Sequence, residues 1–212
     1  MEAFAKFAQW KVGANAKALN LPMSEAESSD YELLRQLAKG DETAFRALYE
    51  RYQGLIYRFA LHMGGDSATA KETTQEVFML LITNSKAYDP AKGSVGGYLF
   101  GMARNLTRRS LQHARLEVPL EEEGMESEES LVANGIDALD GLTNAEMLDC
   151  LRKAVQALPE AYRETVILCD LEELNYADAG EALGCSPGTV ASRLHRARNL
   201  LKAKLKSKQC VK

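Results

Sequence analysis

Residues 176–198 read YADAGEALGCSPGTVASRLHRAR, which is the pattern of two short helices joined by a tight turn. Gly184 suits the end of the first helix, because a left-handed backbone has little steric cost at a residue without a Cβ. Ser186 suits the N-cap of the second helix, and Pro187 suits its first position, where no backbone donor is needed. The stretch predicts a helix-turn-helix, the motif that presents a helix to the DNA major groove.

The second of these helices is predicted to have one apolar and one polar face. At about 100° per residue, the apolar stripe comprises Val190, Leu194, Ala197, Leu201 and Leu205. Residues 187–212 contain eight Lys or Arg and no acid, which favours contact with nucleic acid over a merely solvated face. The candidate DNA contacts lie on the polar side and its flanks: Thr189, Ser192, Arg193, His195, Arg196 and Asn199.

The composition of the 212 residues indicates the fold class and the kind of protein to expect. Leu, Ala and Glu dominate and Pro is scarce, so we expect an all-α fold of two small helical domains. No apolar run approaches the ~18 residues that span a bilayer, and residues 1–22 lack a signal-peptide pattern. We therefore expect a cytoplasmic protein without membrane insertion.

The four cysteines form no C-x-x-C pair and have no His at ligand spacing, so no metal or other cofactor is expected. Cys150 and Cys169 fall on apolar helical faces, where a free thiol packs as a small hydrophobe. A redox role stays open for Cys210.

The net charge of −4 is unevenly distributed. Residues 118–147 carry nine acids and no base, so the remainder of the chain is net positive. Residues 117–143 have the composition of an acidic flexible linker. This linker would join a first helical domain, residues 30–116, to a second, residues 144–212. In the first domain, a helix is expected to begin at Tyr31 after a solvated lead-in, and Asp41 is expected to cap the next helix. Residues 1–29 would form an N-terminal extension, within which Met23 is an alternative start.

The last helix predicted in the first domain also has a basic face. It is expected to begin near Ser94, with Ser94 as its N-cap, and no acid occurs from Ala91 to Leu116. Guanidinium groups can each donate two hydrogen bonds to a phosphate, and aromatic rings can stack on unpaired bases. On its helical spacing alone, Tyr98 fits a place in the core better than a role as a base platform. The candidate contacts of this segment are Tyr88, Tyr98, Arg104, Asn105, Arg108 and Arg115.

These motifs resemble those of the extracytoplasmic-function (ECF) sigma factors, which are specificity subunits of bacterial RNA polymerase. Residues 44–57, 75–78 and 88–105 resemble sigma region two, whereas residues 158–176 and 188–198 resemble sigma region four. The resemblance implies that the first domain opens and reads the −10 promoter element and that the helix from Ser186 reads the −35 element as duplex. It also implies a surface that docks on the clamp helices of the largest polymerase subunit, formed by Glu72, Gln75, Glu76 and Phe78.

The same resemblance implies core RNA polymerase (clamp helices and flap), promoter DNA and a cognate anti-sigma factor as partners, and no catalytic residues. The chain departs from the family at Tyr98, where Trp is common, and at Ala191, where Lys or Arg is frequent. Gly96, Gly97 and Gly101 replace bulkier or basic residues. We interpret these departures as changes of promoter preference. Two alternatives are a sigma-like decoy that binds an anti-sigma protein without contacting DNA, and a stand-alone repressor, which leaves residues 75–78 unexplained.

Overall fold

The computed structural model describes the backbone of residues 23–117 and 138–207, and the side chains of residues 30–114 and 147–205. Every regular element in these ranges is helical, which confirms the predicted all-α class. Residues 1–22 of the predicted extension, residues 118–137 of the predicted linker, and Cys210 lie outside the described residues. None of the described helices is both long and apolar enough to cross a membrane.

The first domain is a helical bundle. It contains α2 (Met23–Leu37), α3 (Glu42–Gly64), α4 (Ser67–Asn84), the short 3₁₀-helix η2 (Ser85–Ala87) and α5 (Val95–Glu117). Phe59 of α3 meets Phe100 of α5 edge to face, with ring centroids 5.7 Å apart, an arrangement that aromatic pairs prefer. The other large side chains fully buried in this bundle include Leu34, Leu48, Ile56, Met63, Leu81 and Leu99.

Polar side chains begin the helices where the sequence predicts. Asp41 accepts hydrogen bonds from the amides of Thr43 (2.8 Å) and Ala44 (3.3 Å). Together with the Thr43 hydroxyl, these bonds hold the pKa of Asp41 below its ordinary value. Ser94 accepts a hydrogen bond from the Gly97 amide at 3.0 Å, which confirms Ser94 as the cap of α5.

Helix α2 begins at Met23, upstream of the start that we predict near Asp30. Asp30 is buried inside this helix instead of preceding it. Its carboxylate forms an ion pair with Arg51 and accepts a hydrogen bond from the Tyr52 hydroxyl at 2.5 Å. Asp30 therefore joins α2 to α3, which explains why a carboxylate is tolerated at a buried position.

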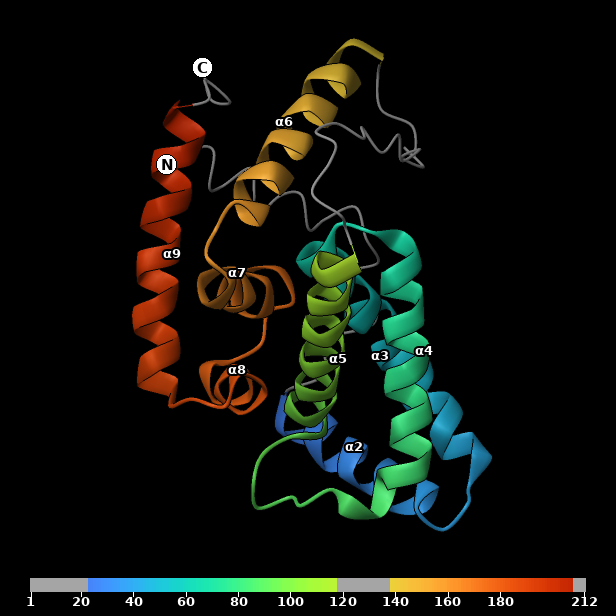
Figure 1. Cartoon of the computed structure of the whole chain (residues 1–212). Helices are drawn as coiled ribbons and strands as arrows, with labels where there is room; N and C mark the ends of the chain where they lie inside the picture. The colour runs from blue at the N-terminus through green and yellow to red at the C-terminus, as the bar shows by residue number, and fades with distance from the viewer. Residues whose placement is uncertain (1–22, 118–137, 208–212) are drawn as a thin grey trace.

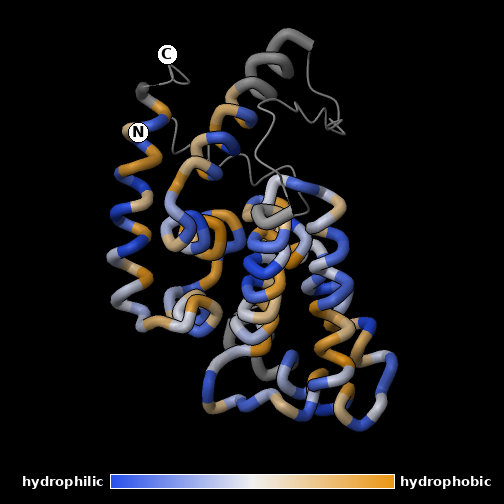
Figure 2. The backbone as a smooth tube through the Cα atoms, viewed as in Figure 1, coloured by the Kyte–Doolittle hydropathy of each residue, from blue (hydrophilic) through white to orange (hydrophobic). Residues whose placement is uncertain are grey.

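The second domain contains α6 (Ala138–Gln156), α7 (Glu160–Val166), the π-helix η3 (Ile167–Leu171), α8 (Tyr176–Leu183) and α9 (Pro187–Ser207). Helix α6 begins within the range predicted for the linker. Along α9, hydrophobic and hydrophilic residues alternate at helical spacing (Figure 2). The fully buried residues of this domain include Val166, Ile167, Leu168, Val190, Leu194 and Ala197.

The two domains pack directly against each other. Helix α5 lies between α3 and α4 on one side and α7 and α8 on the other, and α9 covers the far side of α7 and α8 (Figure 1). The buried apolar residues of both domains form one continuous cluster. The helix predicted to read the −10 element is therefore in contact with the helix-turn-helix.

Candidate nucleic-acid interface

The helix-turn-helix predicted over residues 176–198 is formed by α8, a tight turn and α9. The Asn175 side chain caps α8 and accepts hydrogen bonds from two amides of its first turn, both at 2.9 Å. Gly184 ends α8 with φ 65°, and Ser186 accepts a hydrogen bond from the Thr189 amide at 3.2 Å. The predicted C-terminal glycine and N-cap serine are thus confirmed.

Gly180 allows α8 to approach the turn closely. A Cβ at Gly180 would lie 2.7 Å from the carbonyl oxygen of Cys185, a distance at which the backbone would have to move. The Cys185 amide donates a hydrogen bond to the Gly180 carbonyl at 2.9 Å. The sequence signal for this contact is a glycine in the interior of a short helix, which we did not use in the prediction.

Helix α9 separates a buried face from an exposed face, as predicted. Val190, Leu194, Ala197 and Leu201 are buried. Thr189 and Arg193 are half-buried at the border between the two faces. The remaining candidate contacts are exposed: Ser192, His195, Arg196 and Asn199.

The arginines of α9 differ in their surroundings. Arg198 donates hydrogen bonds to both carboxylate oxygens of Asp170, at 2.6 and 3.1 Å, and these raise the pKa of Arg198. Arg198 therefore holds α9 against η3. Arg193 donates a longer hydrogen bond to Sγ of Cys185, at 3.7 Å. Arg196 is exposed, in the middle of the face that would meet DNA.

The segment before α5 gathers three aromatic rings. The rings of Tyr88 and Tyr98 lie 5.4 Å apart, and Tyr31 of α2 lies 6.2 Å from Tyr88. The Tyr88 hydroxyl donates a hydrogen bond to the Gly93 carbonyl at 2.6 Å. Burial, and then the nearby Glu181 carboxylate, raise the pKa of Tyr88 to about 12. Tyr98 is half-buried and packs against the core, and its contact with a base stays a prediction.

Two arginines of the predicted basic face on α5 contact carboxylates of the second domain. Nε of Arg104 lies 2.8 Å from the Glu164 carboxylate, and the two side chains are only 17% and 2% exposed. Nε of Arg108 lies 2.7 Å from Glu160 in a more exposed pair. Asn105 is exposed, and the Arg115 side chain lies outside the described residues. The predicted arginine stripe is thus partly covered in this arrangement.

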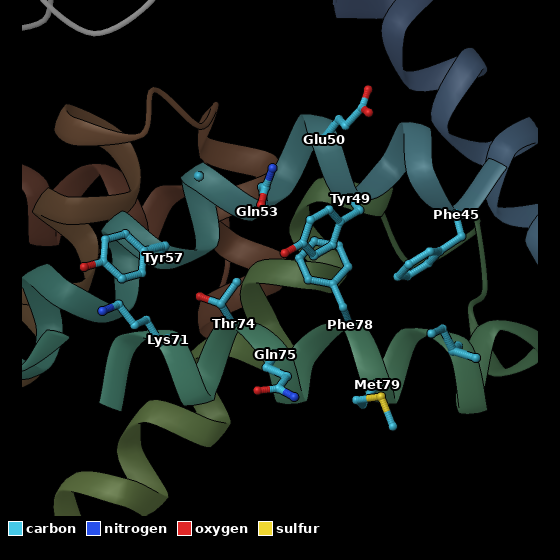
Figure 3. Close-up of a pocket in the computed structure, with 12 residues that line it drawn as sticks. Phe45, Tyr49, Glu50, Gln53, Tyr57, Lys71, Thr74, Gln75, Phe78 and Met79 are labelled. Carbon is cyan, nitrogen blue, oxygen red and sulfur yellow. The ribbon is translucent and has the colours of Figure 1, made fainter. Parts of the chain in front are cut away.

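A groove lies between α3 and α4 on the face predicted to dock on the polymerase (Figure 3). Gln75 lines it, and Phe78 forms its floor, 3% exposed, with its ring 4.7 Å from the ring of Tyr49. Met79 and Ile82 are 57% and 46% exposed. Of the other predicted docking residues, Glu72 and Glu76 are exposed. Tyr49, Met79 and Ile82 also line the groove but were not predicted as docking residues.

Further polar contacts join the domains. Arg58 of α3 donates hydrogen bonds to both oxygens of the buried Glu172 carboxylate, at 2.8 and 3.3 Å. Arg163 of α7 donates one to the carbonyl oxygen of Met63, at the end of α3 (3.1 Å). Burial, with the charges of Arg152 and Arg58, lowers the pKa of His62 to about 4. The contact between the domains is therefore polar at its edge and apolar within.

The cysteines and acidic residues show no metal site among the described residues, because no three His, Cys, Asp or Glu side chains lie close enough to hold an ion. Cys169 and Cys185 are free. Burial raises the pKa of the Cys169 thiol to about 11, which makes this thiol unreactive. Cys150 is disulfide-bonded, so the expectation of a free thiol there is wrong.

Comparisons with known proteins agree with this architecture. Residues 48–116 match the family model of sigma-70 region 2, and residues 148–201 match that of sigma-70 region 4. The ECF RNA polymerase sigma factor SigM of Bacillus subtilis is 32% identical over 74% of this chain and 91% of its own. SigW of the same organism, also an ECF sigma factor, is 28% identical over 82% of this chain and 95% of its own.

The fold is also found in a solved structure, that of the sigma factor RpoE bound to the anti-sigma factor NepR from Bartonella quintana. The TM-score is 0.58 and the identity 23%, over 76% of this chain and 96% of that one. Two family models in the expected order, and a relative above 30% identity that is matched over almost its full length, establish the family. The chain belongs to the ECF RNA polymerase sigma factors.

Proposed function

We propose that this chain binds core RNA polymerase and directs it to promoters by contacting a −35 and a −10 element. The observation that carries the proposal is the α9 face: polar, exposed and free of acids along a helix whose opposite face is buried. A rigid helix of this kind fits the major groove. The chain would work with the polymerase in the cytoplasm and contribute no catalytic step of its own.

The −35 element would be read as duplex DNA by the exposed side of α9. Arg196 and Asn199 have the side chains that pair with guanine and adenine edges, respectively. Thr189 lies in the first turn of α9, so the N-terminal end of the helix would enter the groove. We assign Arg198 a structural role and no contact with DNA, because Asp170 already accepts two hydrogen bonds from it.

The −10 element would be read by residues 88–105 as a single strand. Tyr88 and Tyr98 supply two rings around the start of α5, and Asn105 supplies a hydrogen-bonding side chain in the middle of that helix. Stacking contributes about 1–3 kcal/mol per base, which offsets the few kcal/mol that unstacking costs. Arg104, Arg108 and Arg115 would contact phosphates once they are accessible.

Core polymerase would dock on the groove between α3 and α4. Exposed apolar side chains beside exposed carboxylates are typical of a protein interface with an apolar centre and a polar rim. Met79 and Ile82 would form the apolar centre, with Glu72, Gln75 and Glu76 at the rim. An anti-sigma factor is a further proposed partner, supported by the likeness to RpoE, which was solved with one bound.

In vitro transcription with the full chain and core polymerase, on a pool of random upstream sequences, tests the proposal. We expect enrichment of templates with one paired −35 and −10 motif, and loss of the −35 motif alone with Arg196→Ala. Lys202→Ala, a change at another exposed basic position of α9, should retain the motif. A stable complex with polymerase or an anti-sigma protein, but no selective initiation, would support the decoy function instead.

A further inference from the structure

Helix α2 carries an exposed aromatic ring beside the segment proposed to read the −10 element. The helix contacts both η2, just before this segment, and α5 (Figure 1). Leu34 and Leu37 of α2 are buried in the core, whereas Tyr31 on the same helix is 42% exposed. The Tyr31 side chain is therefore available for a contact outside the bundle.

The position of Tyr31 is fixed by its neighbour in the chain. Asp30 is buried, pairs with Arg51 of α3 and accepts a hydrogen bond from the Tyr52 hydroxyl. The same hydroxyl oxygen lies at the start of α5, 3.4 Å from the place that a Cβ on Gly96 would occupy. The backbone at Tyr31 is thus tied to α3 and placed next to the start of α5. Binding of a ligand to this ring would therefore need little further ordering of the chain.

Tyr31 belongs to an aromatic cluster with the two rings of the −10 segment. The Tyr88 ring lies 5.4 Å from that of Tyr98 and 6.2 Å from that of Tyr31, to which it is tilted by 43°. The hydrogen bond from the Tyr88 hydroxyl to the Gly93 carbonyl holds the central ring in place. Tyr88 and Tyr98 are half-buried against the core, so Tyr31 is the most exposed ring of the cluster.

The charges around the aromatic cluster favour a nucleic acid over an apolar peptide as its ligand. Both oxygens of the Glu32 carboxylate accept hydrogen bonds from Arg35, at 2.8 and 2.9 Å. The Asp89 carboxylate lies 3.9 Å from Nζ of Lys92, whose side chain is 80% exposed. Lys86 of η2 is exposed as well. The acids beside the rings therefore have partners within the chain, and exposed lysines lie where a phosphate could bind.

We propose that Tyr31 stacks on one unpaired base of the promoter and so extends the −10 surface from the segment before α5 onto α2. The proposal rests on the proposed function, because it needs a single strand that the chain reads. Tyr31 lies upstream of residues 48–116, the range that matches sigma-70 region 2, so the family match does not assign this contact. Every base has a flat face that can stack on an aromatic ring, and Tyr31 would thus add affinity at one position with little selectivity.

Loss of the ring should weaken binding of the unpaired strand by about 5- to 150-fold, the value of one base–aromatic stack. Tyr31→Leu removes the ring and keeps an apolar, helix-forming side chain, and circular dichroism verifies that the helices are retained. Tyr31→Phe removes only the hydroxyl and should bind as the unaltered chain does. Tyr176→Leu is the matched control, because Tyr176 is 44% exposed and begins another helix, α8.

The assay is binding of the full chain with core polymerase to a promoter selected from the random pool. The non-template strand is left unpaired over the −10 element, so that duplex opening does not enter the affinity. An abasic site is then placed at each unpaired position in turn. At one position the abasic site should weaken binding by the unaltered chain and weaken binding by Tyr31→Leu no further, because the stack is already lost. Tyr176→Leu should be additive with every abasic site.

Additive effects of Tyr31→Leu and the abasic site at every position would overturn the proposal. A loss of polymerase binding of the same size in the absence of DNA would also overturn it, because the ring would then contact protein. Either result, together with a −10 motif selected by the unaltered chain, would leave the proposed function intact. Selection of no −10 motif by the unaltered chain would refute the proposed function and the Tyr31 contact with it.

Discussion

The ion pair between Arg104 and Glu164 should contribute measurably to the contact between the domains. The Glu164 side chain is 2% exposed and that of Arg104 17%, so solvent screens the pair weakly. A hydrogen bond to a charged group contributes about 1.5–3 kcal/mol. We therefore expect Arg104→Met and Glu164→Gln to show a coupling free energy of about 2 kcal/mol in a double-mutant cycle.

The assay is urea unfolding of the full chain, followed by far-UV circular dichroism, for the two single variants and the double variant. The pair Arg108–Glu160 is the control, since it joins the same two helices but its side chains are 38% and 45% exposed. Exposed pairs are typically worth less than about 1 kcal/mol. A coupling for Arg104–Glu164 no larger than that of the control would refute a closed, desolvated contact in solution.

Three further predictions concern DNA, polymerase and pH. Arg196→Ala should reduce discrimination between −35 sequences by about 1–3 kcal/mol if the side chain reads a base; equal weakening on all templates in a binding assay would assign it to phosphate. Met79→Asp should weaken assembly with core polymerase, because it places a charge in the apolar part of the groove. Unchanged assembly would show that polymerase docks on another surface. Burial, and then the charge of Asp178, raise the pKa of Glu181 to about 7 from the ordinary 4.5. The arrangement in which α8 packs on α5 therefore binds more protons than one in which the two helices are apart, so this packing should be strongest below about pH 4.5 and weaken as pH rises through about 7. Small-angle X-ray scattering of the full chain should show the two domains less closely packed as pH rises, and Glu181→Gln, in which Asp178 and Tyr88 still face position 181, should lose this trend.

The helix boundaries that the sequence predicted well depend on local chemistry. Asp41, Ser94 and Ser186 each bond an amide two or three residues away, so their role is encoded within one turn. The start of α2 was predicted too late, because the acidic residues before Asp30 were interpreted as a solvated lead. Acids are equally favourable in the first turn of a helix, and the structure has a helix there.

The features of the site that could not be predicted from the sequence depend on contacts between segments far apart along the chain. Helical periodicity correctly placed Arg104 and Arg108 on the side of α5 away from the bundle core. It could not show that Glu164 and Glu160, more than fifty residues further along the chain, meet them. An acid-free helix face predicts a preference for anions. Whether the anion is a phosphate or a carboxylate of the same chain is decided by packing.

The glycines of α5 are the clearest case of a sequence feature with a different physical cause from the one first inferred. Taken alone, Gly96, Gly97 and Gly101 indicate a less restrictive −10 reader, because they lack side chains that could contact a base. In the structure, a Cβ at Gly97 would overlap with the end of the Glu181 side chain and lie 3.3 Å from the carbonyl oxygen of Asp178, and a Cβ at Gly101 would lie 3.8 Å from the Cα of Ala182. Each glycine in a helix lowers its stability by up to about 1 kcal/mol relative to alanine, and the close packing of α8 on α5 offsets part of that cost. The same glycines therefore let α8 pack closely on α5, a role that depends on a contact with a distant part of the chain and has no signal in the local sequence.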